Sequence, residues 1–326
     1  MSATGLRTRL TPAELRGPVR VLLRQHRRAL WAACALLVLG IAFVVALRIW
    51  VASSYERCPD GDTTRCGDGT YLATYARTST ETFLADGGTA LLWLAGLIGV
   101  FVAGPLIARE LENGTFRFGW AQSMSPARWL AARIALPAAL VTAGTTVLVL
   151  VYRWGRSGVQ GPNAYGLDWP QRGVFPALGP VAVGYALLAV ALGALFAVLV
   201  RRTLLSMGLT ALVLGTVMLG FSKRRYELWP TARTLGREPQ PNSWYTETGM
   251  LTPSGKELYW KDCFGTGRTP ENFADCLTDR GGVTYFTDYH PASHFWPLQL
   301  VETAVLLALA AGAAVLAFRV LRRRHA

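Results

Sequence analysis

The sequence predicts an all-α polytopic membrane protein with six transmembrane helices and both termini in the cytoplasm. Uncharged runs of about 19 residues or more recur along the 326-residue chain, and each can cross roughly 30 Å of bilayer hydrocarbon as a helix. Soluble domains seldom contain even one such run, because their helices need a polar face. The runs cover residues 29–47, 87–108, 134–152, 173–200, 203–222 and 295–318, with Glu302 interrupting the last.

The distribution of positive charge predicts the orientation. A net charge of +13 suggests a nucleic-acid partner if its position is ignored. However, 17 of the 33 Lys and Arg residues fall in the four segments 1–28, 109–133, 201–202 and 319–326, which hold only three acidic residues. This is the positive-inside pattern, so we place these segments in the cytoplasm and expect a lipid bilayer rather than nucleic acid as the surroundings. The cluster Lys223-Arg224-Arg225 falls on the predicted outer side, where a long loop has little weight in that rule.

The first 28 residues form a predicted cytoplasmic tail ahead of a six-helix transmembrane domain at 29–326. Thr11-Pro12-Ala13-Glu14 fits a capping box that starts a helix, and Gly17-Pro18 breaks it. The following piece has apolar residues on one face and arginines on the other, which predicts an amphipathic helix at the membrane interface. A basic flank that only orients the first span is an equally good interpretation.

The segment 109–133, which we call the elbow, joins the second and third spans. Asn113-Gly114 is a helix stop, and Ser125-Pro126 is an N-cap followed by proline at the first helical position. We therefore expect a short broken helix across the inner membrane face. In the span before it, Ala95, Gly99 and Ala103 repeat every four residues, a spacing that lets another helix approach closely. Gly104 comes one residue too late to complete a glycine pair.

Two outer loops, 53–86 and 223–294, contain four of the five cysteines. Cys58 with Cys66 and Cys263 with Cys276 suggest two disulfides in an oxidising compartment, with free thiols as the alternative. Cys34 lies inside the first span. The loop 223–294 is too long and too rich in aromatic residues for a linker, and we expect it to fold over the membrane surface as a large extracellular segment.

The chain lacks the motifs of an enzyme. It contains no phosphate-binding G-x-x-x-x-G-K-[ST] loop, H-E-x-x-H, G-x-S-x-G or C-x-x-C, so we expect no catalytic residues, no ATP hydrolysis by this chain alone and no cofactor of its own. His290 and His294 have the spacing of helical metal ligands, but two histidines at headgroup level are the simpler interpretation, and we predict no metal site.

Glu302 is the only carboxylate within a predicted span, and Gln299 lies one turn before it. An ionised carboxylate is costly in a membrane, so Glu302 should be paired, hydrogen-bonded or protonated. Two interpretations remain open. The residue either makes a structural hydrogen bond to the large outer segment or lines a substrate path.

The six spans, the amphipathic N-terminal piece, the charged elbow and the large outer segment before the last span together resemble the ABC-2 type permease, the membrane subunit of ABC exporters. The sequence Leu106-Ile107-Ala108-Arg109-Glu110-Leu111-Glu112-Asn113-Gly114-Thr115 is similar to that family's inner motif, in which a glutamate precedes Gly-Thr or Gly-Ser by one helical turn. The stretch Phe295-Trp296-Pro297-Leu298-Gln299-Leu300-Val301-Glu302 is similar to the last span of actinobacterial members. The architecture matches over almost the whole chain.

The resemblance implies a multi-pass plasma-membrane protein that works as a homodimer or heterodimer with a soluble ABC ATPase. ATP and Mg would bind that ATPase, because this chain has no ATPase domain. The residues implied in coupling are Arg109, Glu110, Glu112, Gly114, Thr115, Phe116, Phe118 and Trp120, with Arg117 and Arg128 adding charge. Aromatic side chains here fill a groove on the ATPase or, alternatively, lie among headgroups. The implied function is export of an amphiphilic or drug-like substrate. The alternative is a non-transporting membrane sensor or scaffold.

Overall fold

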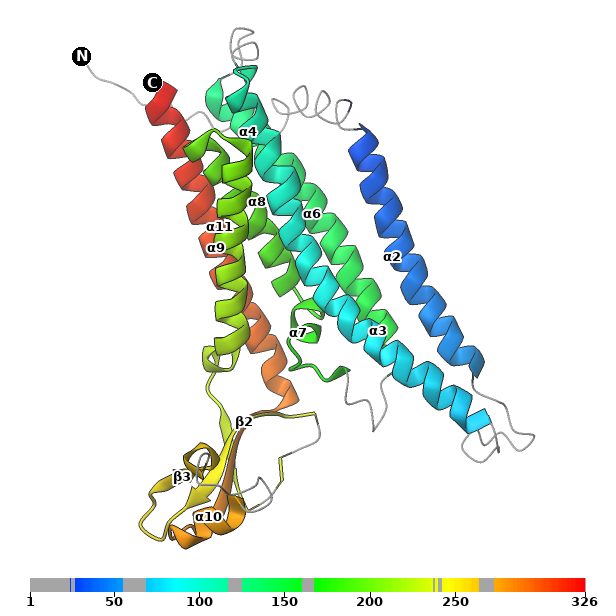
Figure 1. The fold of residues 1–326 in the computed structure, drawn as a ribbon, viewed down its shortest axis with the longest axis vertical. Coiled ribbons are helices and arrows are strands. Elements are labelled where there is room, and N and C mark those ends of the chain that lie inside the picture. The colour runs from blue at the N-terminus through cyan, green and yellow to red at the C-terminus, as the bar shows by residue number, and fades with distance from the viewer. Residues whose placement is uncertain are drawn as a thin grey trace. The chain divides into compact units, whose positions relative to one another are not determined.

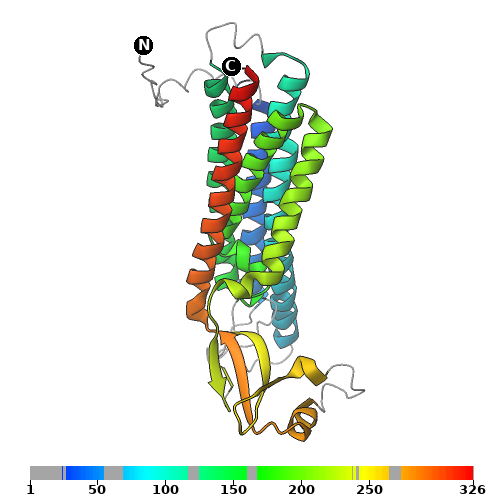
Figure 2. The ribbon, with the colours of Figure 1, turned by 90° about the vertical axis from the view of Figure 1, so that its left-hand side faces the viewer.

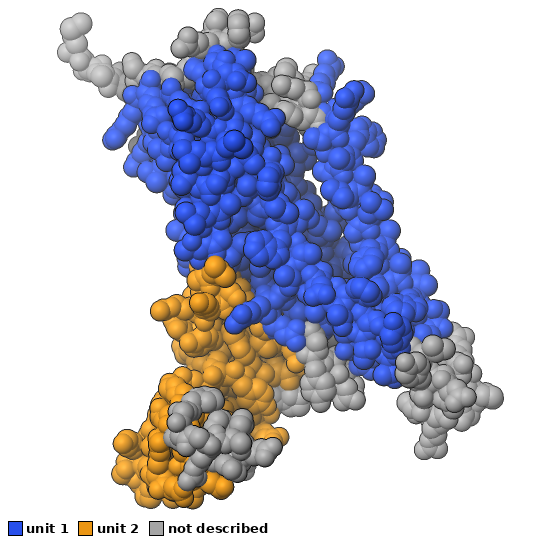
Figure 3. Space-filling view, viewed as in Figure 1, with its two compact units in different colours: residues 1–167, 171–218, 303–326 blue, residues 168–170, 219–302 orange. Residues whose placement is uncertain are grey.

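A computed structural model describes residue 24 and residues 27–54, 69–116, 125–159, 167–236, 238–239, 242–263 and 273–325. The chain divides into two compact units (Figure 3). The first comprises residues 1–167, 171–218 and 303–326, and its described part is helical. The second comprises residues 168–170 and 219–302 and contains a small sheet. The expected N-terminal amphipathic helix and the Cys58–Cys66 pair lie outside the described residues.

The described part of the chain contains six helical segments long and apolar enough to cross a membrane, which confirms the predicted number of spans. They appear as long rods in Figures 1 and 2. The helices are α2 (Arg27–Ser54), α3 (Gly69–Ile98), a π-helical turn (Gly99–Ala103), α4 (Gly104–Glu112), α6 (Pro126–Ser157), the short α7 (Val174–Ala177), α8 (Val181–Val200), α9 (Thr203–Arg224) and α11 (Phe295–His325). The second span consists of α3, the π turn and α4 in succession.

The second span begins earlier than its uncharged run. Residues 69–86, expected in the outer loop 53–86, form the first turns of α3. Arg77 and Glu81 lie four residues apart on this helix, and Arg77 Nε donates to Glu81 Oε1 over 3.2 Å. Because such a pair neutralises both charges on one helical face, the helix continues through a sequence that hydropathy alone assigns to a loop.

Helix α8 lies at the centre of the helical unit. It is apolar on all sides, as expected for a helix surrounded by protein, and most of its residues are buried. It contacts α3, the π turn, α4 and α6. Val141 of α6 and Ala103 of the π turn pack with Ala186 and Val190 of α8 in one buried cluster.

The second unit corrects the prediction of an all-α protein. Four antiparallel strands form a sheet in the order β1-β4-β2-β3. They are β1 (Ala232–Leu235), β2 (Trp244–Leu251), β3 (Glu257–Tyr259) and β4 (Thr284–His290). Thr, Tyr, Phe and Trp dominate β2 and β4, and these side chains favour a pleated, half-buried surface.

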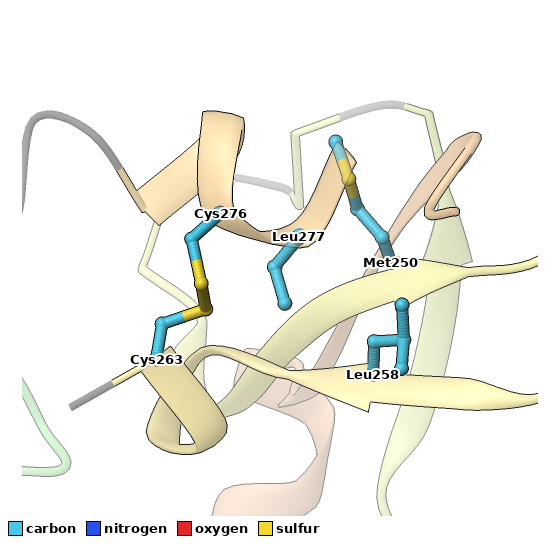
Figure 4. Packing of buried hydrophobic residues seen from close by; sticks show 5 residues of the cluster. All are labelled: Met250, Leu258, Cys263, Cys276 and Leu277. Atoms are coloured by element: carbon cyan, nitrogen blue, oxygen red, sulfur yellow. A yellow bond between two sulfur atoms is a disulfide. The ribbon is translucent and has the colours of Figure 1, made fainter. Parts of the chain in front are cut away.

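A disulfide fastens the edge of this sheet. Cys263 and Cys276 are bonded, which confirms the predicted pairing, and they join the short helical turn after β3 to α10 (Phe273–Asp279). Both sulfurs lie in a small apolar core with Met250, Leu258 and Leu277 (Figure 4). Such a small unit buries little apolar surface, so the covalent link supplies part of its stability.

Candidate functional site

The elbow has the helix boundaries that its sequence predicts. Helix α4 ends at Glu112, Asn113 is its C-cap, and Gly114 takes a left-handed φ of 71°. Glycine alone adopts that conformation without steric cost. On the far side, Ser125 Oγ accepts the backbone N–H of Arg128 over 3.3 Å, and Pro126 is the first residue of α6. Residues 117–124, including Arg117, Phe118 and Trp120, lie outside the described residues.

Glu110 connects the end of α4 to the start of α6. Its Oε2 accepts the indole Nε1–H of Trp129 over 3.2 Å and forms an ion pair with Arg133. The Arg133 guanidinium also lies over the Trp129 ring, 4.4 Å from the ring centre. Trp129 is fully buried, and the Glu110 side chain is only 21% exposed. Glu110 therefore has a set of partners within its own chain, although the family resemblance placed it among the residues that couple to the ATPase.

Glu112 connects the same end of α4 to α9. Its Oε2 accepts both the backbone N–H of Thr203, over 3.0 Å, and the Thr203 hydroxyl, over 2.7 Å. Thr203 is the first residue of α9. Two carboxylates separated by one residue thus bind two different helices, and the end of the second span is joined to the beginnings of the third and the fifth.

The remaining elbow residues divide into buried and exposed groups. Phe116 is buried, whereas Arg109 and Thr115 are exposed. The Thr115 hydroxyl lies 3.5 Å from the carbonyl oxygen of Glu110. Arg128 is partly buried in the first turn of α6. Arg109 and Thr115 thus lie at the surface of the helical unit, whereas Phe116 and Trp129 lie in its interior.

The small residues predicted for close packing lie next to α8. A Cβ atom on Gly99 would come within 2.3 Å of the Ala189 Cβ, and Ala103 is buried in the α8 cluster. In the π turn the N–H of Gly104 donates to the carbonyl of Gly99, five residues back. A π turn closes over five residues where an α-helical turn closes over four, so Gly104 lies alongside Gly99. Both glycines lie against Gly193. The side chain of Ala95 is outside the described residues.

Glu302 is bound to Arg225, a residue of the predicted outer segment 223–294. It forms a bidentate ion pair with Arg225, with Nε to Oε2 at 2.6 Å and Nη2 to Oε1 at 3.0 Å. The two side chains are 4% and 0% exposed. Arg225 belongs to the cluster that disagreed with the positive-inside pattern, and Arg224 also has a carboxylate partner, Glu227 at 3.6 Å. Two of the three basic residues in this cluster, Arg224 and Arg225, are thus paired with carboxylates. Gln299, one turn away, is fully buried.

His290 and His294 bind each other. Their Nδ1 atoms are 3.0 Å apart, and His290 Nε2 lies 2.9 Å from the carbonyl oxygen of Tyr226. Because a carbonyl only accepts, Nε2 of His290 carries the proton and Nδ1 accepts from His294. Burial lowers the pKa of His290, against the opposing effect of the Tyr226 carbonyl. Both ring nitrogens of His290 are therefore engaged within the protein.

Four residues have contacts that were not predicted from the sequence: Trp129, Arg133, Thr203 and Arg225. Trp129 and Arg133 are four residues apart in a helix that begins at Pro126, so their shared face was a usable signal. Arg225 was visible as one of three basic residues on the predicted outer side. Nothing in the sequence indicated Thr203, because its donor groups meet a carboxylate 91 residues away.

Comparison with known proteins agrees with this architecture. The model of the family described as "ABC-2 membrane transporter related" matches residues 31–224. That range is more than half of the chain, and it runs from α2 to the end of α9 with the whole elbow inside it. A search of curated proteins found no match. The six candidate spans and the extent of the family match establish that the chain belongs to the ABC-2 membrane transporter related family.

Proposed function

We propose that this chain is the membrane subunit of an ATP-driven exporter. ATP hydrolysis on a separate soluble ABC ATPase drives outward movement of an amphiphilic or drug-like substrate through the helical unit. ATP and Mg bind the ATPase, and this chain supplies the transport path without chemistry of its own. A second permease copy, identical or related, completes the transporter in the plasma membrane.

The observation that carries this proposal is the connection of three spans at the elbow. Glu110 binds α6 through Trp129 and Arg133, and Glu112 binds α9 through Thr203. A force applied to the elbow therefore reaches more than the two helices that the elbow joins in sequence. Membership of a family of transporter membrane proteins supports the same conclusion.

The proposed orientation places the elbow in the cytoplasm. Six spans put both chain ends on one side of the membrane. The arginine-rich segments, the elbow among them, then face the side that the positive-inside rule assigns to the cytoplasm. Only that side offers ATP to a soluble partner.

Surface labelling tests the orientation. Asn113 is exposed, and Cys34 is the free cysteine within the described residues. An Asn113→Cys variant in which Cys34, Cys58 and Cys66 are replaced by Ser should react with a membrane-impermeant maleimide in opened cells and stay unlabelled in intact cells. Labelling in intact cells would overturn the proposal.

Co-purification and transport test the function. Full-length chain isolated from its native membrane should carry a soluble P-loop ATPase, and the reconstituted complex should move a fluorescent amphiphile only with ATP. A Glu110→Gln variant should transport less substrate per ATP. The control is Glu247→Gln, which changes an exposed carboxylate of the sheet paired with Lys261. Cargo movement without any ATPase would refute the proposal, and absence of both ATPase and transport would favour the sensor or scaffold.

A further inference from the structure

We propose that the contact between Glu112 and Thr203 is a strut that carries movement of the elbow into α9. This inference rests on the proposed function, because it assigns a positioning residue to the coupling step. It concerns a link between segments far apart in the sequence, and it makes α9 respond directly to the elbow.

Helix α9 begins without a short polar side chain of its own at the N-cap. The first four N–H groups of a helix have no partner within the helix, and Ser, Thr, Asp or Asn usually provides one. Here Arg201 and Arg202 precede Thr203. Glu112 supplies the missing acceptor from α4, through hydrogen bonds of 3.0 Å to the Thr203 backbone N–H and 2.7 Å to its hydroxyl. The cap of α9 is thus provided by another span.

The chemistry of this contact makes it strong for an exposed link. A charged acceptor at a helix N-terminus is favoured by the partial positive charge of the unsatisfied N–H groups. Hydrogen bonds to a carboxylate are also shorter and stronger than neutral ones. One of the two donors is a backbone group, so displacement of Glu112 acts on the helix itself rather than on a flexible side chain.

The turn before α9 offers little slack. Only Arg201 and Arg202 separate α8 from α9, and Arg201 takes a left-handed φ of 56°. The end of α8 is held in addition by Arg324, whose guanidinium donates to the carbonyl of Val198 over 3.1 Å. Because such a short turn cannot absorb a large displacement, movement of α4 must shift α9 or break the contact.

The spacing of the two elbow carboxylates separates their effects. Residues two positions apart on an α-helix point about 200° away from each other. Glu110 therefore reaches α6 while Glu112 reaches α9, and each can be removed without touching the other's partner. This separation gives a pair of matched variants.

Hydrogen exchange in the absence of any ATPase tests the strut itself. In full-length chain in nanodiscs, Glu112→Ala should raise amide exchange in the first turn of α9 by about fivefold, because the helix loses its cap. Glu110→Ala should instead raise exchange at the start of α6. Thr203→Ser keeps both donors and should preserve protection. The control Thr216→Val removes a hydroxyl that bonds only the α9 backbone, at the Leu212 carbonyl.

Transport in the complex with the ATPase tests the coupling. Glu112→Ala should reduce substrate moved per ATP while the ATPase still binds, and Thr203→Ser should retain coupling. Unchanged exchange in α9 would overturn the strut and leave the proposed function intact. Altered exchange with normal transport per ATP would show a purely structural cap and also overturn it. If ATP drives no transport in wild-type protein, the proposed function fails, and the strut's coupling role fails with it.

Discussion

Removing the charge of Glu302 should destabilise the protein strongly. Glu302→Gln keeps the size and shape of the side chain but leaves the Arg225 guanidinium, 4% exposed, facing an amide instead of a carboxylate. The two hydrogen bonds of 2.6 and 3.0 Å lose their ionic component at the same time. The perturbation is therefore electrostatic rather than steric.

The burial of both Arg225 and Glu302 determines how much stability the substitution removes. Breaking a buried ion pair from one side costs about 3–5 kcal/mol, because the remaining charge loses its compensation. Replacing both charges should cost much less, so Glu302→Gln combined with Arg225→Gln should recover part of the loss. The exposed pair Arg224–Glu227 provides a control. Its side chains are 79% and 47% exposed, so Glu227→Gln should cost about 1 kcal/mol or less.

Thermal unfolding of the full chain in detergent, followed by near-ultraviolet circular dichroism, measures these differences through the packing of aromatic side chains. The expected order of stability is wild type and Glu227→Gln highest, the double variant next and Glu302→Gln lowest. A Glu302→Gln variant as stable as wild type would refute the reasoning. So would a double variant no more stable than Glu302→Gln alone.

Three further perturbations have defined outcomes. Gly193→Val should destabilise the full chain by about 1–3 kcal/mol in the same assay, because a Cβ there would lie 2.9 Å from backbone atoms of Gly99 and Gly104. Unchanged stability would show that the helices can separate freely. The double variant Cys263→Ser, Cys276→Ser removes a disulfide that joins residues 13 positions apart, and it should lower the free energy of unfolding by about 3 kcal/mol. The loss should appear as a lower urea midpoint for unfolding of the sheet. As a control, wild-type protein with its disulfide reduced should have the same midpoint as the variant. Hydrogen bonds from Arg233 and, to a lesser extent, from the Tyr259 hydroxyl lower the pKa of Glu257. The carboxylate should therefore contribute its full stabilisation above the ordinary pKa of 4.5 and lose it as the pH falls through the lowered pKa. Glu257→Gln should lower the urea midpoint at pH 7 but not in strong acid.

Hydrophobic run length predicted the spans because membrane crossing sets a minimum that few soluble segments reach. The same criterion misplaced the start of α3. Because charged residues precede position 87, the uncharged run begins only there, whereas the helix begins at Gly69 and includes the Arg77–Glu81 pair. Hydropathy treats each charge separately, and only the geometry of the helix reveals their mutual compensation.

The sheet was not predicted because its strands are short and the segments between them are rich in Gly and Pro. β3 has only three residues, and β1 pairs with β4 across more than 40 residues of chain. Arg225 and Glu302 illustrate the same limit at the level of side chains. Each was conspicuous alone, one as a misplaced cation and one as a carboxylate within a span. Their pairing joins residues 77 positions apart, which no local pattern encodes.

The elbow was predicted best where local rules apply. Gly114 and Ser125 have the conformations that turn and capping preferences require. The partners of Glu110 and Glu112 were not predicted, because carboxylates near a membrane face suggest an external protein as readily as an internal one. In the structure both carboxylates accept hydrogen bonds from residues of the same chain, Trp129 and Thr203.

The π turn at Gly99–Ala103 has a consequence for chain length in this region. One surplus residue rotates everything after it by about 100° relative to a regular helix. Deleting that residue would replace the π turn by regular winding and leave Glu110 and Glu112 facing Trp129 and Thr203, whereas regular winding of the undeleted sequence would turn both carboxylates away from these partners. Functional relatives that lack this residue should therefore have an unbroken α-helix at this place and keep their acidic side chains directed at the same two helices.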